Sequence, residues 1–146
     1  MNTSKKQVLI LCTGNSARSQ MAEGLLRHYS GEYFEVASAG TNPSEVRPEA
    51  IQVMREVGID ISNQRSKHVD EFSRRRFDYV LTVCDNARET CPIFPGDAVI
   101  VHKSFEDPAA ASGPEPVRLA VFRRVRDELR EYLRSFAALI RGHVVT

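Results

Sequence analysis

Residues 12–19 have the types and the order needed to hold a tetrahedral anion beside a nucleophilic thiol. They follow residues 7–11, a short apolar run typical of a buried parallel strand, and precede a helical pattern that begins at about Arg18. A loop between a strand and a helix can direct several backbone N–H groups at one anion, and the helix dipole adds to the attraction. Gly14 and Asn15 tolerate the positive φ that a tight loop requires. The pattern therefore predicts an oxyanion site.

Cys12 and Arg18 are the residues of this loop that we expect to do chemistry. A positive environment lowers the pKa of a thiol, so Cys12 is predicted to be a thiolate at neutral pH, with Ser19 donating a hydrogen bond to its sulfur. Arg18 can clamp two anion oxygens with its planar guanidinium. The predicted anion site comprises Thr13, Gly14, Asn15, Ser16, Ala17, Arg18 and Ser19. The Gly-Lys-Ser/Thr ending of a nucleotide P-loop is missing. The alternative interpretation is a buried structural cysteine beside a surface arginine.

Alternating strands and helices must position this loop. Apolar runs predict further strands at residues 35–39, 77–83 and 98–101, and helical patterns cover residues 18–29, 48–58 and 117–140. Residues 62–68 and 106–116 are expected to be loops, the first followed by a short helix. The apolar stripe of the last helix is predicted to be Val117, Val121, Val125, Leu129, Tyr132, Leu133, Phe136 and Ile140. This order predicts an α/β fold, a three-layer αβα sandwich with a four-stranded parallel sheet, in a single domain of residues 1–146.

Composition excludes several classes of protein. The formal net charge is +1, without the basic excess that nucleic-acid or membrane partners require. Apolar runs are too short for a membrane span, and residues 8–11 are too short for a secretory signal. Three cysteines cannot all pair within one chain, so we expect a monomer in the reducing cytoplasm. The four histidines lack metal-ligand spacing, so neither a metal site nor a bound cofactor is predicted.

The loop also carries a family resemblance. Residues 12–19, continued by Gln20-Met21-Ala22-Glu23-Gly24, resemble the active-site loop of the low-molecular-weight tyrosine phosphatases. They resemble more closely the thioredoxin-coupled arsenate reductases built on that fold, and the resemblance extends over nearly the whole chain. It implies that the protein reduces arsenate to arsenite, with thioredoxin as the electron donor.

The resemblance assigns the steps to Cys12, Cys84, Cys91 and Asp107. Cys12 attacks arsenate while Asp107 protonates the leaving oxygen. Cys84 then attacks the Cys12 sulfur and releases arsenite, and Cys91 attacks Cys84 to leave a disulfide for thioredoxin. If residues 84–91 are helical, they span about 10.5 Å. A disulfide tolerates a Cα separation of only about 4.4–6.8 Å, so this segment is predicted to be a redox switch that unwinds on oxidation.

The sequence departs from the family pattern at several positions. Ala17 stands where many relatives have a second loop cysteine, and Gln20 replaces a proline that is usual in the phosphatases. Alanines follow Asp107-Pro108 in place of the tyrosines that stack on a phosphotyrosine ring, which favours arsenate. Some of the reductases hold a potassium ion at positions that correspond here to Asn15, Glu23, Ser38, Arg65 and Lys67. Because Lys67 replaces a carboxylate there, activity is predicted to be insensitive to potassium.

Two other functions stay open. One is a low-molecular-weight tyrosine phosphatase in which Cys84 and Cys91 are incidental. The other is a non-catalytic sensor that binds an oxyanion, or arsenic, through three soft thiol ligands.

Overall fold

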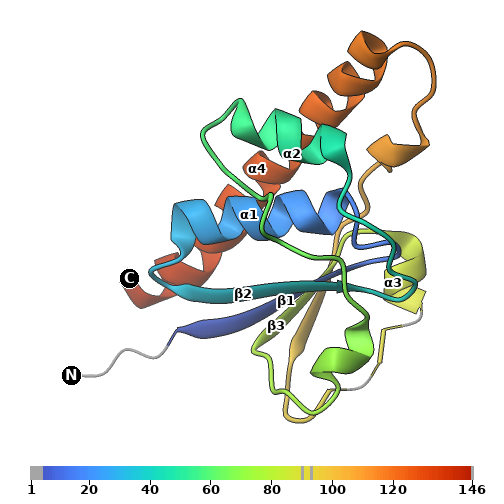
Figure 1. Ribbon diagram of the computed structural model, residues 1–146. Helices are drawn as coiled ribbons and strands as arrows, with labels where there is room; N and C mark the ends of the chain where they lie inside the picture. The colour runs from blue at the N-terminus through green and yellow to red at the C-terminus, as the bar shows by residue number, and fades with distance from the viewer. Residues whose placement is uncertain (1–4, 90, 93, 146) are drawn as a thin grey trace.

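The structure is a computed structural model that describes residues 5–89, 91, 92 and 94–145. These residues form a four-stranded parallel sheet in the order β2-β1-β3-β4 (Figure 1). The strands are β1 (Lys6–Cys12), β2 (Phe34–Gly40), β3 (Tyr79–Thr82) and β4 (Val99–His102). The α/β class and the parallel sheet are as predicted, and each strand lies within two residues of its predicted bounds. The largest difference is in β3, which is three residues shorter than the predicted strand at residues 77–83. The N–H group of Val83, just after β3, still donates to the Leu11 carbonyl of β1.

Helices cover the sheet and connect its strands. On one face lie α1 (Arg18–Ser30), α2 (Pro48–Arg55) and α4 (Glu115–Val145), and on the other lies the 3-10 helix η1 (Val69–Phe72) (Figure 1). The short helix α3 (Asp85–Glu89) lies at the carboxyl edge of the sheet, and η2 (Pro108–Ala110) precedes α4. Pro48 occupies the first turn of α2, where its missing N–H has no cost. No helix in the described ranges has the length and apolarity needed to cross a membrane.

The core is centred on β1. Val8, Leu9, Ile10 and Leu11 have no exposed surface, because β1 has a strand on each side and is covered on both faces. Each such side chain contributes about 1.5–3 kcal/mol through burial. Cys12 is the last residue of this strand, so the best-packed element of the fold fixes the backbone of the predicted nucleophile.

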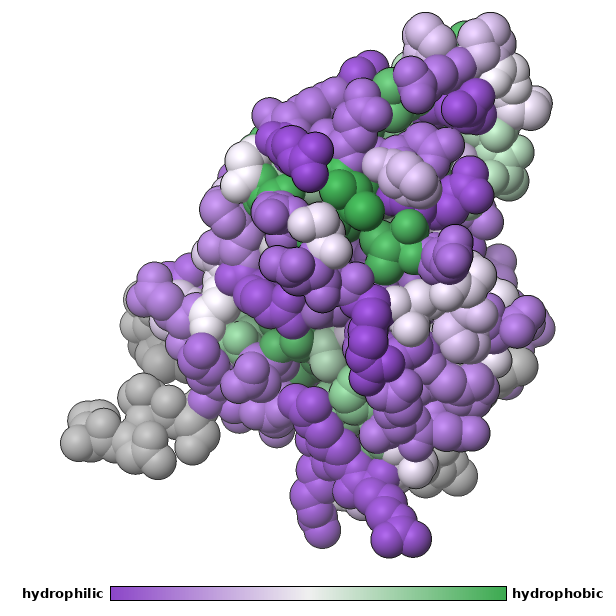
Figure 2. Space-filling model, in the orientation of Figure 1, coloured by the Kyte–Doolittle hydropathy of each residue, from purple (hydrophilic) through white to green (hydrophobic). Residues whose placement is uncertain are grey.

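Two regions are less covered. In β4, an edge strand that pairs only with β3, Val99 and Ile100 are 52% and 50% exposed. The predicted stripe of α4 is wrong at Val117, which is 53% exposed, because the first turns of α4 extend beyond the other helices (Figure 1). The remaining stripe residues are buried or half-buried. The molecular face in Figure 2 is mainly hydrophilic, with apolar side chains visible in small patches among the helices.

Candidate active site

The loop between β1 and α1 turns its carbonyl groups outward. The five consecutive carbonyls of residues 12–16 each accept a hydrogen bond from outside the loop, at 2.9–3.2 Å. The donors are the backbone N–H groups of Thr41, Asn42, Ser44 and Arg47 and the side chains of Gln20 and Ser66. Since successive carbonyls point away from the loop, the N–H groups are left to face its interior.

These inward N–H groups are free for a ligand. Among the described residues, the amides of residues 13–19 have a single acceptor, the Cys12 sulfur, which receives the Asn15 N–H. Buried amides without an acceptor are costly unless water or an anion satisfies them. Together with the first turn of α1, these amides give the loop a geometry that could hold an anion, and the anion site itself stays a prediction.

Asn15 locks the shape of the loop. It has a φ of 46°, has no exposed surface, and uses its side chain fully. Its Nδ2 donates to Ser19 Oγ at 2.8 Å and to Ser38 Oγ at 3.0 Å, and its Oδ1 accepts the Lys67 N–H at 3.0 Å. Of the two loop residues that tolerate a positive φ, Asn15 adopts it and Gly14 does not. The predicted bond from Ser19 to Cys12 is not found in the described part of the chain.

Gly40, at the end of β2, is a site residue that the sequence analysis missed. A Cβ atom at this position would lie 2.4 Å from the Thr13 carbonyl oxygen and 3.0 Å from the Asn15 backbone nitrogen. Only glycine therefore allows β2 to end so close to the loop. The feature of the sequence that could have revealed this role is the position of Gly40 directly after the predicted strand at residues 35–39.

Cys84 follows β3 and reaches Cys12, as the parallel sheet predicted. Interaction with the Cys12 thiol lowers the pKa of Cys84 to about 5, with further help from the Thr13 hydroxyl, the Ala87 N–H and the Arg18 charge. The same interaction and burial raise the pKa of Cys12, against the lowering effects of Arg18 and the Asn15 N–H. The two shifts arise from one pair of interacting thiols, and the thiolate form of Cys12 stays a prediction.

Polar side chains hold the first turn of α3. Thr13 Oγ1 lies 3.3 Å from Cys84 Sγ and 3.3 Å from Asn86 Oδ1, which also accepts from Thr41 Oγ1 at 3.2 Å. Ala87 N–H donates to Cys84 Sγ at 3.4 Å. Asn86 was missed from the sequence, although it lies between two of the predicted relay cysteines.

Cys91, which follows α3 in the sequence, is half-buried. Its Sγ lies 3.5 Å from the Pro92 carbonyl oxygen, and burial raises the pKa of its thiol. All three cysteines are free thiols. Among the described residues no group of three His, Cys, Asp or Glu side chains is arranged to hold a metal ion.

Arg18 and Asp107 meet at the mouth of the loop. Arg18 Nη1 donates to the Phe105 carbonyl at 3.1 Å, and Nη2 lies 3.6 Å from Asp107 Oδ2. The buried Nε–H of Arg18 has no acceptor among the described residues, so the guanidinium retains donors for an anion. Asp107 also accepts the Ala109 N–H at 3.0 Å and thereby caps η2, which leaves its carboxyl group half-exposed beside Arg18.

The potassium site of some relatives does not fit these residues. Lys67 Nζ donates to the Arg65 carbonyl at 3.0 Å and lies 3.8 Å from Glu23 Oε1. Burial lowers the pKa of Lys67, while the neighbouring Glu23 raises it. The amino group therefore takes the place and the partners that a monovalent cation would need.

Comparison with known proteins agrees with this geometry. A model described as "Low molecular weight phosphotyrosine protein phosphatase" matches residues 7–145. The chain belongs to this family. Curated arsenate reductases from Halalkalibacterium halodurans and Bacillus subtilis are each 46% identical, over 91% and 90% of this chain and 96% and 95% of their own.

Solved structures of the family give the same fold. An arsenate reductase in its phosphate-binding state is 34% identical with a TM-score of 0.76, over 92% of this chain and 98% of its own. A low molecular weight protein tyrosine phosphatase from T. tengcongensis is 29% identical with a TM-score of 0.76, over 91% and 98%. The family fold therefore serves both activities, and residues beyond the loop must distinguish them.

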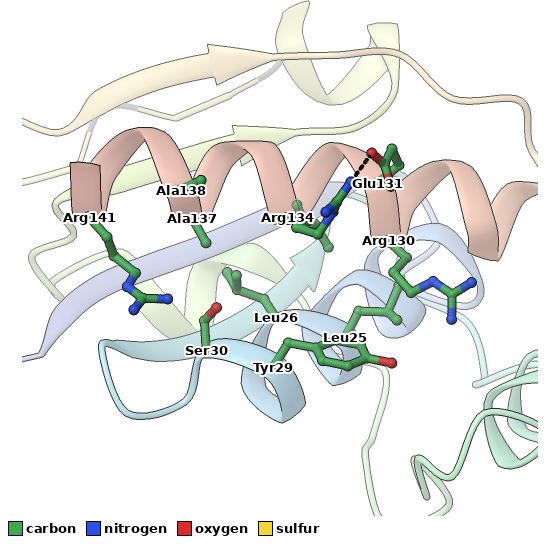
Figure 3. A pocket seen from close by; sticks show the side chains of 11 residues that line it. Leu25, Leu26, Tyr29, Ser30, Arg130, Glu131, Arg134, Ala137, Ala138 and Arg141 are labelled. Atoms are coloured by element: carbon green, nitrogen blue, oxygen red, sulfur yellow. Dashed lines mark hydrogen bonds and ion pairs between the residues drawn. The ribbon is translucent and has the colours of Figure 1, made fainter. Parts of the chain in front are cut away.

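A groove between α1 and α4 lies apart from this site (Figure 3). It encloses about 320 Å³ and is floored by Leu25, Leu26, Leu133 and Ala137, with arginines at its rim. None of the loop, thiol or Asp107 side chains lines it. The anion site is instead a shallow nest of backbone amides.

Proposed function

We propose that this enzyme reduces arsenate to arsenite through three thiols, and that thioredoxin resets them. One observation carries the proposal: a second thiol, Cys84, lies at the anion loop, with its Sγ 3.3 Å from Thr13 Oγ1, because it follows the strand that pairs with the strand of Cys12. A phosphatase needs a single cysteine, whereas a reductase needs a second thiol close enough to form a disulfide with the first. The arsenate reductases that are 46% identical support the same substrate.

The first step forms a bond between Cys12 and arsenic. Arsenate binds to the free amides of the loop and to Arg18. Cys12 passes its proton to Cys84 and attacks arsenic, while Asp107 protonates the departing oxygen, which leaves as water. Attack by the sulfur changes no oxidation state.

Electrons move in the second step. Cys84 releases the proton that it took from Cys12 to water, and its thiolate then attacks the Cys12 sulfur while the sulfur–arsenic bond breaks with its electron pair on arsenic. Arsenic leaves as arsenite, and a Cys12–Cys84 disulfide remains. Cys91 then attacks Cys84, which frees Cys12 and leaves a Cys84–Cys91 disulfide. The dithiol of thioredoxin reduces this bond, so each arsenate consumes two electrons and two protons.

This scheme needs groups from one chain and no resident metal. We accordingly propose a monomer of one domain, residues 1–146, acting in the cytoplasm, where thioredoxin keeps free thiols reduced. The second candidate is hydrolysis of aryl phosphates, favoured by the TM-score of 0.76 to a tyrosine phosphatase. Because phosphate and arsenate have the same shape and charge, a weak activity of this kind accompanies the reductase.

The deciding experiment is arsenate-dependent oxidation of NADPH with thioredoxin and thioredoxin reductase. We expect turnover in the wild type and at least about 1000-fold less in Cys84→Ser and in Cys91→Ser, because each variant interrupts the relay. Brisk hydrolysis of aryl phosphate that survives both substitutions, without arsenate turnover, would identify a phosphatase.

A further inference from the structure

His102, the last residue of β4, connects the sheet to the first residue of α3. Its Nδ1 lies 2.7 Å from Thr82 Oγ1, and its Nε2 lies 3.0 Å from Asp85 Oδ1. Thr82 is fully buried in β3, and the two residues are direct partners in the β3–β4 register. The ring is thus held at one end by the core and presents its other nitrogen to α3.

The contact with Asp85 does not depend on the charge of the ring. In a neutral imidazole, Thr82 donates to Nδ1 and the Nε2–H donates to Asp85. In an imidazolium, both nitrogens donate and Thr82 accepts. In either form Asp85 accepts a hydrogen bond from the Nε2–H group. The buried Thr82 hydroxyl at Nδ1 fixes the orientation of the ring and therefore the direction of that bond.

Helix α3 depends on such outside contacts. It has only five residues, too few to be stable through its own hydrogen bonds. Asp85 directly follows Cys84, so the position of Asp85 constrains the direction of the Cys84 side chain. The side chain of Asp85 is 72% exposed, so its pairing with His102 adds little to the stability of the fold. The pairing therefore acts on the position of Asp85 and of the neighbouring Cys84 side chain.

We propose that His102 is a positioning residue of the thiol relay, because its contact with Asp85 keeps Cys84 directed at Cys12 for the first disulfide exchange. This role rests on the proposed function, and it adds a residue that the sequence analysis set aside with the other histidines. His102 touches neither the anion nor a sulfur and acts through Asp85.

A second pair of the same kind provides matched controls. His68 Nδ1 accepts the Asp70 N–H at 2.9 Å and lies 3.4 Å from Asp70 Oδ2, at the start of η1. This is also a histidine–aspartate contact at the first turn of a short helix, but the helix carries no cysteine. His68→Leu and Asp70→Ala therefore reproduce the chemical change without altering α3.

The test uses the Cys91→Ser chain, in which the relay stops at the Cys12–Cys84 disulfide. Reduced protein is mixed with arsenate, quenched with an alkylating agent at timed intervals, and analysed by peptide mass spectrometry. We expect His102→Leu and Asp85→Ala to slow disulfide formation by about 3- to 10-fold, the loss of one directed hydrogen bond. The double variant should be no slower than either single variant. His102→Gln, which retains an N–H for Asp85, should stay within about 2-fold of the parent.

A parallel measurement separates positioning from damage to the loop. Protection of Cys12 from alkylation by inorganic phosphate reports the loop alone, and it should be unchanged in every variant. Equal rates in parent and variants, additive effects, slowing by the control variants, or an equal loss of phosphate protection would overturn the role of His102. Asp85→Ala alters an exposed side chain and keeps the test valid if His102→Leu fails to fold. If the parent itself forms no Cys12–Cys84 disulfide with arsenate, the proposed function fails and the positioning role falls with it.

Discussion

The anion loop and the segment after Cys84 leave neighbouring strands, yet they are held in different ways. Each of five loop carbonyls is bonded to another part of the fold, and Asn15 is fully buried. The segment after Cys84 has one helix of five residues, contacts through exposed side chains, and an edge strand that is half-exposed. Binding an anion requires fixed donors, whereas forming successive disulfides requires sulfur atoms that move. The two requirements are met by separate segments that meet at one pair of thiols.

The largest expected effect is on phosphate affinity, after a substitution in the rigid anion loop. Asn15→Ala removes three hydrogen bonds and places a side chain that disfavours positive φ at 46°. We expect phosphate affinity to fall by about 100-fold, the equivalent of roughly 3 kcal/mol. Isothermal titration with inorganic phosphate measures it.

Asn15→Gly distinguishes the two causes, since glycine keeps the φ and loses only the hydrogen bonds. Its loss should be roughly 10-fold. Equal affinity in the alanine variant and the wild type would mean that Asn15 does not fix the loop.

The next effect concerns the thiols where the two segments meet. The interaction with Cys12 is the first cause of the lowered pKa of Cys84, about 5, so Cys84 is predicted to stay a thiolate as the pH falls toward that value. In Cys12→Ala this pKa rises, and the rate of Cys84 alkylation at pH 6 should fall by roughly 10- to 100-fold. Peptide mapping after brief iodoacetamide treatment gives the rate.

The ratio of the rates at pH 6 and pH 9 corrects for any change in access to Cys84. A ratio that is the same in both proteins would show that Cys12 does not set the ionisation of Cys84.

Oxidation sharpens the contrast between the segments. Helix α3 occupies five of the residues between Cys84 and Cys91, and a helix over the whole interval would hold the two Cα atoms about 10.5 Å apart, too far for a disulfide, so we expect α3 to unwind on oxidation. Hydrogen exchange of residues 85–89 is expected to be at least about 10-fold faster in the oxidised protein, while β1 changes little. Mass spectrometry of reduced and oxidised samples measures both peptides together. Equal protection in the two states would argue against a redox switch.

The smallest expected effect is a response to potassium. Because Lys67 Nζ already contacts the Arg65 carbonyl and Glu23, exchange of sodium for potassium at constant ionic strength should alter arsenate turnover by less than about 2-fold. A clear stimulation by potassium would mean that the amino group leaves its position and a cation enters.

The sequence predicted the frame of the site better than its contacts. The alternation of apolar runs and helical patterns was sufficient for the sheet, and the parallel strands brought Cys84 to the edge where Cys12 lies. The exposure of Val117 could not be predicted, because a helical stripe does not reveal where neighbouring helices end. The interaction between the Cys12 and Cys84 thiols and the close approach at Gly40 depend on interatomic distances between segments far apart in the chain.

Lys67 has a consequence beyond its role as a neighbour of the loop. A dissolved ion binds in proportion to its concentration, whereas a side chain is always present at its site. The amino group at Glu23 therefore cannot be diluted, chelated or replaced by another ion of the medium. A hydrogen bond to the Arg65 carbonyl holds this countercharge in place, so its presence beside Glu23 does not depend on the supply of a particular ion in the cell.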